Sequence, residues 1–160
     1  MKQQVQLIKW QQDRLMQIRT AKALRLMCRN VIVHGLQHAD QRKHVPASTW
    51  YREHATVRLA GPRYYGHTLA YATLSRLFRH TVVVYVAQEY ADLQRKRIST
   101  SNVGVVTLNT LKKTMDKYPG IECVVLDNAS IQSAARLNQF YQCVSHIKAE
   151  DGPICLVLLG

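Results

Sequence analysis

The alternation of short apolar runs with helical stretches after residue 55 limits the folds open to this chain more than any other feature. Runs rich in β-branched residues predict strands at Thr56–Ala60, Thr81–Ala87, Val103–Thr107, Ile121–Leu126 and Ile154–Leu159. Helical stretches at about 67–79, 89–97, 108–117 and 131–148 accompany them. Strands that are apolar throughout and alternate with helices are typical of a parallel sheet with both faces covered. The sequence therefore predicts an α/β three-layer sandwich over residues 55–160, in which ligands bind beyond the carboxyl ends of the strands.

The residue pattern over positions 1–30 predicts a long basic helix that precedes the sheet. No proline or glycine occurs from residue 2 to residue 28, and apolar residues recur at helical spacing: Val5, Ile8, Leu15, Ile18, Leu24 and Met27. The segment also holds Lys2, Lys9, Arg14, Arg19, Lys22, Arg25 and Arg29 against the single acid Asp13. This pattern indicates an amphipathic helix whose basic face is solvated, contacts phosphates or docks on a partner, and patterning alone does not separate these alternatives.

Residues 31–54 are expected to connect the helix to the sheet. His34, His38, His44 and His54 occur there together with Asp40. Their spacing matches no standard zinc pattern, and no cysteine joins them. We therefore expect an irregular connection over 34–54 whose histidines have no ligand role.

The segment Gly61-Pro-Arg-Tyr-Tyr-Gly-His-Thr68 lies between a predicted strand and a predicted helix. It follows the P-loop pattern G-x-x-x-x-G-K-[ST] except where His67 replaces the lysine. Gly61 and Gly66 let backbone N–H groups curl around a phosphate, the helix N-terminus adds a positive dipole, and Thr68 offers a hydroxyl to Mg²⁺. Imidazole is shorter than a lysine side chain and mostly neutral at pH 7, whereas Arg63 can supply a permanent cation. The alternative is an ordinary strand–turn–helix whose glycines serve only the backbone geometry.

A second motif ends the apolar run Ile121–Leu126 with Asp127 and Asn128. This is the Walker B form, in which the aspartate holds the Mg²⁺ that bridges two phosphates of the nucleotide. Asn128 stands where a catalytic glutamate is usual, and an amide orients a water but cannot take its proton. The alternative for Asp127 is a turn or helix-capping residue at the end of a buried strand.

With these two motifs in this order, residues 55–160 resemble the first RecA-like domain of nucleic-acid helicases and of the large terminase (DNA-packaging) subunits of phages. The stretch Thr81–Gln88 looks like their strand whose end touches single-stranded nucleic acid, and Val105–Leu111 looks like their next strand and threonine-containing turn. The stretch Ile154–Gly160 looks like the strand that couples hydrolysis to nucleic acid. The resemblance implies a P-loop NTPase fold with degenerate Walker A and Walker B motifs.

Three departures from that pattern predict weak or no ATP hydrolysis. His67 replaces the lysine, Asn128 replaces the glutamate, and the sequence stops where a second RecA-like lobe or a nuclease domain would begin. A lone lobe has no arginine finger in cis. Each charged or hydrogen-bonding group that stabilises the transition state in such sites typically raises the hydrolysis rate about 10³–10⁵-fold. We expect ATP and Mg²⁺ to be bound weakly, if they are bound.

The charge balance predicts a polyanionic partner. The chain has 22 Lys and Arg against 10 Asp and Glu, a net charge of +12, which favours nucleic acid ahead of an anionic membrane. No apolar run approaches the ~20 residues of a membrane span, and the N-terminus is not signal-like. The cysteines form no CxxC pair, and those in apolar runs are expected to behave as buried hydrophobes. These features favour a reducing cytoplasmic setting, the host cytoplasm if the protein is viral, without disulfides.

The leading hypothesis is a degenerate P-loop accessory protein from a phage or mobile element that binds nucleic acid, DNA ahead of RNA. Its binding surface would contain Lys9, Arg14, Arg19, Arg25, Arg95, Lys96, Arg97, Lys112 and Lys113. One alternative is an active ring-forming ATPase, of a packaging or helicase-loader type, completed in trans by a neighbouring subunit. Another is an interaction module that binds a partner protein, or a second copy, through the long helix. Short charge runs such as Arg95–Arg97 also occur simply as solvated surface.

Overall fold

A computed structural model describes residues 2–60, 67–98 and 100–160. Five strands form one sheet in the order β1-β5-β4-β2-β3, and every neighbouring pair is parallel. The strands are β1 (Thr56–Leu59), β2 (Thr81–Tyr85), β3 (Val103–Thr107), β4 (Cys123–Asp127) and β5 (Cys155–Leu159). Their places and their parallel pairing confirm the α/β architecture that the alternating pattern predicts. The arrangement is compatible with Rossmann-like and P-loop-like folds.

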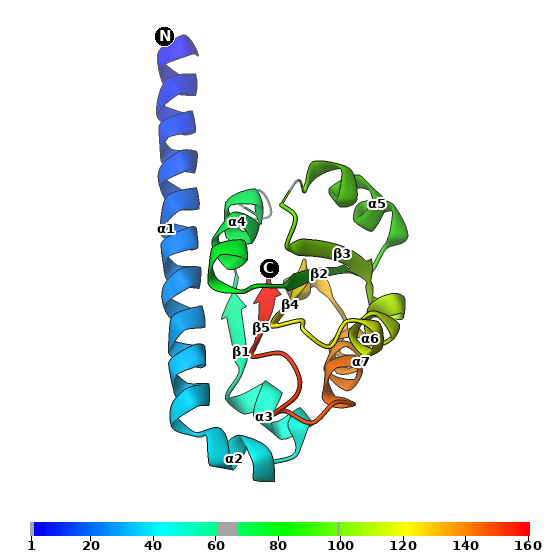
Figure 1. Ribbon diagram of the computed structural model, residues 1–160. Helices are drawn as coiled ribbons and strands as arrows, with labels where there is room; N and C mark the ends of the chain where they lie inside the picture. Colours follow the sequence, from blue (N-terminus) through cyan, green and yellow to red (C-terminus); the bar gives the residue numbers. More distant parts are fainter. Residues whose placement is uncertain (1, 61–66, 99) are drawn as a thin grey trace.

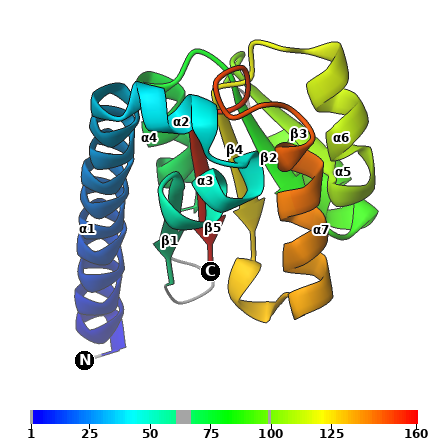
Figure 2. The ribbon, with the colours of Figure 1, turned by 90° about the horizontal axis from the view of Figure 1, so that it is seen from below.

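Helices cover both faces of the sheet (Figures 1 and 2). One face packs against α1 (Lys2–Gln37), α4 (His67–Leu77) and α5 (Gln88–Arg97). The other packs against α3 (Ala47–Glu53), α6 (Leu108–Lys117) and α7 (Ala134–Ser145). This division follows from the strand order, because right-handed crossovers that run in opposite directions along a sheet place their helices on opposite faces.

Burial of the strands accounts for their composition. All residues of β2, β4 and β5 are buried, whereas the edge strands β1 and β3 are partly exposed. Successive side chains enter opposite cores: Val83 and Val125 face α1 and α4, while Val84 and Leu126 face the α6–α7 side. A strand buried on both faces cannot alternate polar and apolar residues, so its sequence is a continuous apolar run.

The segment before the sheet differs from the sequence prediction. The first helix continues to Gln37, and the expected irregular connection over 34–54 instead contains α2 (Ala39–His44) and α3. Gly35 does not stop α1, since one glycine costs a helix only about 1 kcal/mol and packing elsewhere along the helix offsets it. Pro46 lies at the start of α3, where a residue without an N–H is tolerated.

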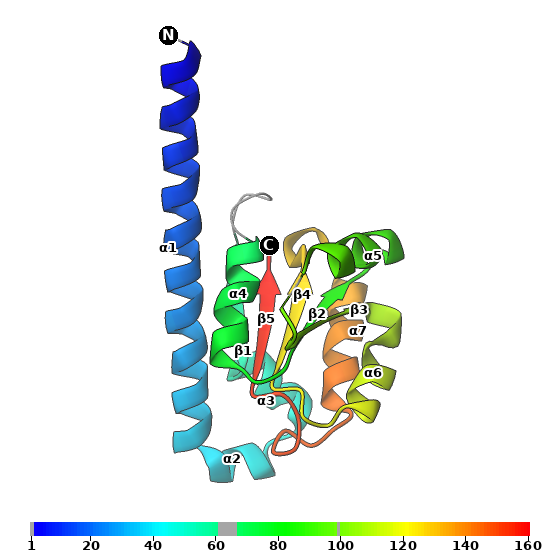
Figure 3. The same ribbon diagram turned by 45° about the horizontal axis from the view of Figure 1, so that its top comes forward.

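The α1 helix packs on the domain only through its second half. Leu24 and Cys28 are fully buried against the sheet and α4, while the first half extends past the carboxyl edge of the sheet (Figures 1 and 3). The domain therefore buries only part of the apolar positions that predict an amphipathic helix over this segment. Val5, Ile8, Leu15 and Ile18 are exposed, and of the six predicted apolar positions only Leu24 is fully buried.

Three free cysteines meet where α1 crosses the sheet. Cys28 comes from α1, and Cys123 and Cys155 are direct neighbours on β4 and β5. All three are fully buried, as expected for Cys123 and Cys155. A hydrogen bond with Cys155, together with burial, raises the pKa of the Cys28 thiol above its ordinary value. Thiols held protonated in an apolar contact behave as small hydrophobic side chains.

The contact between α1 and the sheet can be tested with Leu24→Ala. Removing this fully buried side chain should lower the free energy of unfolding by about 2–5 kcal/mol, because the cavity adds to the lost transfer free energy. Leu7→Ala makes the same chemical change at an exposed site on α1 and should alter stability by less than about 0.5 kcal/mol. Urea denaturation of both variants measures the difference. Equal effects would show that α1 is not docked on the sheet.

Candidate nucleotide-binding site

The carboxyl edge of the sheet brings together three segments that lie far apart in the sequence. Leu59 of β1 is in register with Leu159 of β5, which is in register with Asp127 of β4. The backbone of Gly160 lies so close to Ser130 and Ala60 that a Cβ there would meet their atoms at 3.2–3.3 Å. The ends of β1, β4 and β5 therefore form one compact edge.

This edge is also where the connections of the sheet diverge. The chain leaves β1 towards α4 on one face and leaves β4 towards α7 on the other. In open parallel sheets such a divergence leaves a crevice beyond the strand ends, and ligands bind there. A strand precedes and a helix follows the predicted P-loop segment, because β1 ends before residues 61–66 and α4 begins after them.

The predicted nucleotide-binding residues cluster around this loop. Gly61, Arg63 and Gly66 lie outside the described residues. His67 and Thr68 form the start of α4, where only their backbone is described. The backbone of Thr68 lies one helical turn before Tyr71, whose hydroxyl reaches Asp127, so the first turn of α4 and the end of β4 are neighbours.

Asp127 is the centre of a buried polar network. Its side chain is 3% exposed, and its Oδ2 accepts a hydrogen bond from the Tyr71 hydroxyl. The Tyr71 hydroxyl also lies 2.8 Å from that of Tyr85, and the Asn128 backbone N–H donates to Asp127 Oδ1 at 2.6 Å. Burial, with the nearby Asp127 charge as the next cause, raises the pKa values of Tyr71 and Tyr85 above their ordinary value. Both phenols therefore stay protonated and able to donate.

This network makes Asp127 a poor direct ligand for Mg²⁺. Magnesium keeps several waters and needs an accessible carboxylate oxygen in an octahedral arrangement. The Tyr71 hydroxyl occupies the approach to one oxygen, and the side chain is almost fully buried. The aspartate lies where the Walker B pattern predicts, but its surroundings stabilise a hydrogen-bonded carboxylate rather than an open metal site.

Tyr71 and Tyr85 lie at the candidate site, and the sequence motifs did not predict them. Tyr85 ends the apolar run Thr81–Tyr85 next to the end of β4, and Tyr71 faces the sheet from α4. A tyrosine in a fully buried run needs a partner for its hydroxyl, which is the signal that could have indicated the network.

Asn128 adopts a left-handed backbone conformation, with φ of 55° and ψ of 35°. Asparagine populates this region more readily than glutamate, for which it costs roughly 1 kcal/mol or more. The Asn128 carbonyl then accepts from Ile131 N and Gln132 Nε2 as the chain enters a short 3₁₀ turn. The residue at the usual position of the catalytic glutamate thus shapes the turn after β4.

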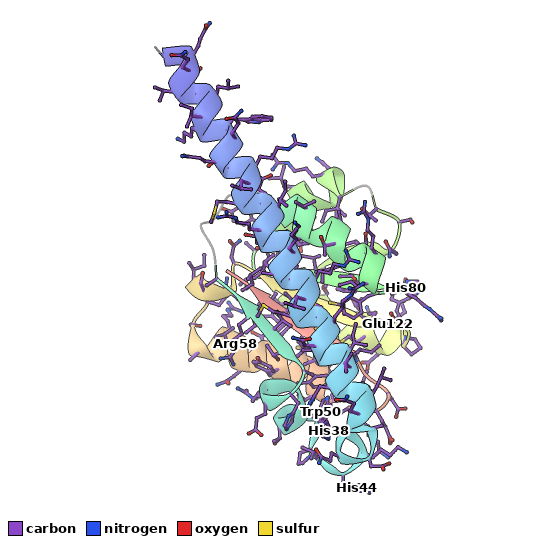
Figure 4. The ribbon with its side chains drawn as sticks, turned by 90° about the vertical axis from the view of Figure 1, so that its left-hand side faces the viewer. His38, His44, Trp50, Arg58, His80 and Glu122 are labelled. Atoms are coloured by element: carbon purple, nitrogen blue, oxygen red, sulfur yellow. The ribbon has the colours of Figure 1, made fainter. Side chains whose placement is uncertain are left out.

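A pocket of about 400 Å³ opens beside the edge on the α7 side. Its lining includes Ala60, Ser130, Gly160 and Tyr141, with Arg52 and Arg58 as the cations. The Arg52 guanidinium lies 4.3 Å from the centre of the Tyr141 ring and donates to Asn138 Oδ1. Arg58 projects from the edge strand β1 (Figure 4). A mostly apolar lining with two arginines, at a volume within the range of small-molecule sites, makes this pocket a candidate ligand site.

The structure separates the basic residues predicted to bind nucleic acid. Lys9, Arg14, Arg19 and Arg25 lie on α1 at one edge of the sheet, and Arg95, Lys96 and Arg97 lie on α5 towards the other. Lys112 and Lys113 are exposed on α6, in the opposite layer. Arg95 is engaged locally, since its Nη1 lies 2.5 Å from Asp92 Oδ1 and its Nε donates to the Val105 carbonyl. These residues do not form one continuous patch.

Three of the four histidines predicted in the connecting segment, His34, His38 and His54, gather at the end of α1, whereas His44 lies apart from them (Figure 4). The His34 ring lies 4.4 Å from that of His38 and 5.3 Å from that of His54, and it stacks on Trp50. Desolvation, with His38 and His54 as further causes, lowers the pKa of His34. Figure 4 shows His38 and Trp50 close together there. In the parts of the chain that are described, no three His, Cys, Asp or Glu side chains are arranged to hold a metal ion.

Comparison with known proteins adds no family assignment. No protein-family model matches the sequence, and no curated protein matches it. None of the helices in the described ranges combines the length and apolar character needed to cross a lipid bilayer.

The network can be tested by removing one hydroxyl at a time. Tyr71→Phe deletes a donor to a charged carboxylate and should lower the free energy of unfolding by about 2 kcal/mol, whereas Tyr85→Phe should cost about 1 kcal/mol. Tyr90→Phe, at an exposed position, is the matched control and should be neutral. Chemical denaturation at pH 7 measures all three.

The pH dependence of the folding stability supplies a second test of the Asp127 network. The folded-state pKa values of Tyr71 and Tyr85 are raised above 10.0, so their contribution is complete below pH 10 and is lost as pH rises beyond it. Stability should therefore fall above pH 10, and less steeply in Tyr71→Phe. An equal slope in the variant would mean that Tyr71 is not buried beside Asp127.

Proposed function

We propose that this chain is a nucleic-acid-binding accessory protein on a P-loop-like scaffold, with weak nucleotide binding and little or no ATP hydrolysis. The observation that carries the proposal is the position of the basic first half of α1. It extends past the same carboxyl edge of the sheet at which β1, β4 and β5 end (Figures 1 and 3).

The charge on this arm supports a polyanionic partner. Lys9, Arg14 and Arg19 are exposed or half-buried on the part that projects beyond the domain, and Asp13 is the only acid of α1. A projecting helix with such a bias can lie along a phosphate backbone without reading base edges. DNA is the expected polymer because of the terminase and helicase resemblance of residues 55–160.

Weak nucleotide binding is supported by the divergence of connections at the edge and by the adjoining pocket with Arg52 and Arg58. Slow or absent hydrolysis is supported by the chemistry of three residues. His67 lacks a permanent charge, Asp127 is buried beneath Tyr71, and Asn128 cannot accept a proton from water.

Replacing Lys9, Arg14, Arg19 and Arg25 with glutamine should weaken duplex DNA binding and flatten its salt dependence. Each lost phosphate contact should reduce the slope of log K against log[salt] by about 0.9, so four contacts give up to about 3.6. Titrations at several salt concentrations measure the slope, and different DNA sequences should behave alike.

The matched control replaces Lys43, Arg76, Arg79 and Lys148, which are exposed at the amino edge of the sheet, with glutamine. This variant removes the same number of positive charges but should leave most of the DNA affinity and of its salt dependence intact. Equal losses in both variants would indicate a diffuse charge effect, and no loss in the α1 variant would exclude the arm as a nucleic-acid contact.

The second test concerns the nucleotide. His67→Lys should raise ATP affinity about tenfold or more, because it restores a charge-assisted contact to phosphate, while turnover should stay low because Asn128 is unchanged. Binding of a fluorescent ATP analogue and steady-state phosphate release measure the two quantities. Turnover of the unaltered protein near 1 s⁻¹ would contradict the proposal and favour an active ATPase.

A further inference from the structure

The outer face of α1 carries an apolar stripe that none of the described elements covers. Leu15 and Val33 each lie nine residues from the buried Leu24, about two and a half helical turns, and so point away from the sheet. The stripe consists of Ile8, Leu15, Ile18, Leu26, Val33 and Leu36, which are 39–74% exposed. Figure 4, in which α1 lies in front, shows no element over this face.

Both faces of α1 thus carry apolar side chains. The inner face is used by the sheet and α4, and the outer face has a row of its own, which Lys22 and Arg29 interrupt. Helices that are apolar around their circumference are normally enclosed by packing on both sides. The first part of α1 has no tertiary contact to hold it, since residues 3–12 are all exposed, and an unsupported helix of that length is marginal in water.

The spacing of the stripe is symmetric about its centre. Ile8, Leu15, Leu26 and Val33 follow one another at 7, 11 and 7 residues. Ile8 and Leu26 are about five full turns apart, as are Leu15 and Val33, so all four lie along one straight line on the helix. In an antiparallel pair of α1 helices, Ile8 of each copy meets Val33 of the other, and Leu15 meets Leu26.

We propose that the outer stripe of α1 is a homodimer interface in which two copies of α1 pack antiparallel about a two-fold axis. Such an isologous contact needs one self-complementary surface, which the symmetric spacing supplies. It also gives the projecting half of each α1 a packing partner, the outer face of the other copy's docked half.

The exposed apolar area of the stripe is large enough for a stable dimer interface. The exposed parts of the six side chains amount to roughly 600 Å² per copy, or roughly 1,200 Å² for the pair before flanking residues are added, which reaches the range of stable interfaces. The charges on α1 oppose the pairing, because Arg19 of one copy approaches Lys22 of the other, twice. Both side chains are long enough to carry their charges into solvent, and salt screens their repulsion.

The salt dependence of association therefore distinguishes a second copy of the chain from other partners of α1. Binding of DNA, an acidic protein or an anionic membrane to α1 weakens as salt rises, whereas the dimer should tighten about tenfold between about 0.05 M and 0.5 M NaCl. Lys9, Arg14 and Arg25 lie off the stripe, whereas Arg19 and Lys22 lie near the two-fold axis, so replacing only Lys9, Arg14 and Arg25 tests DNA binding without removing a residue of the dimer contact.

Sedimentation equilibrium of the full chain tests the proposal. The expected mass is twice the 18.3 kDa of one chain, and Leu15→Gln with Leu26→Gln should raise the dissociation constant by about 100-fold or more, because the two Leu15–Leu26 contacts on either side of the axis, formed by four apolar side chains, are lost. Trp10→Gln with Met16→Gln is the matched control, since both side chains are exposed on α1 but off the stripe, and it should remain dimeric.

The antiparallel orientation of the two α1 helices can be tested separately. In a Cys143→Ser background, Ile8→Cys combined with Val33→Cys should give a disulfide-linked dimer on mild oxidation with oxidised glutathione. Ile8→Cys alone should give no such dimer, because only a parallel pair of helices brings residue 8 of one copy to residue 8 of the other. A monomeric chain at high salt, or a dimer unaffected by the Leu15/Leu26 variant, would overturn the proposal. Monomeric protein that binds phosphatidylserine vesicles, with loss in that variant, would assign the stripe to a membrane surface instead.

Discussion

The parallel register that joins β1, β5 and β4 is the constraint on which the rest of the structure depends. It sets Leu59, Leu159 and Asp127 side by side, although nearly 70 residues separate β1 from β4. Parallel strands need long crossovers, and right-handed crossovers send α4 and α7 to opposite faces of the sheet. The divergence of the chain at the carboxyl edge, the position of the candidate loop and the pocket beside it all follow from this one pairing.

The periodicity of the sequence was sufficient to predict this core. Strands buried on both faces must be apolar throughout, so β2, β4 and β5 could be located to within a residue or two, and Asp127 could be placed at the end of its strand. The segment over 34–54 could not be predicted as well, because α2 and α3 are too short to show a helical period. The contacts of Asp127 were also inaccessible, since they depend on which residue of α4 reaches β4, and only the packing of α4 on the sheet decides that.

The Asp127 network illustrates two opposing demands on one carboxylate. A metal-binding aspartate must keep an oxygen open to hydrated Mg²⁺, whereas a buried aspartate must have its oxygens satisfied by donors. Tyr71 and the Asn128 N–H meet the second demand. With the left-handed turn at Asn128, this arrangement stabilises the end of β4 in a form suited to holding the fold together. The substitutions at His67 and Asn128 and the closure of Asp127 are therefore mutually consistent with the proposed loss of hydrolysis.

The two proposed roles of α1 are energetically linked through its charge. Six half-exposed apolar side chains per copy, roughly 1 kcal/mol each on burial, amount to on the order of 10 kcal/mol for a symmetric pair, while a cation pair 4 Å apart in water costs about 1 kcal/mol. Association also costs several kcal/mol in lost translational and rotational freedom, so the cationic repulsion is large enough to set the concentration at which the pair forms. A nucleic acid that neutralises Arg19 and Lys22 removes that repulsion. The linkage is reciprocal: if polyanion binding favours the antiparallel pair, the pair must bind the polyanion more tightly than the single chain does. The same helix can then be apolar enough to associate on its own, and its association should tighten when a phosphate backbone neutralises its charge.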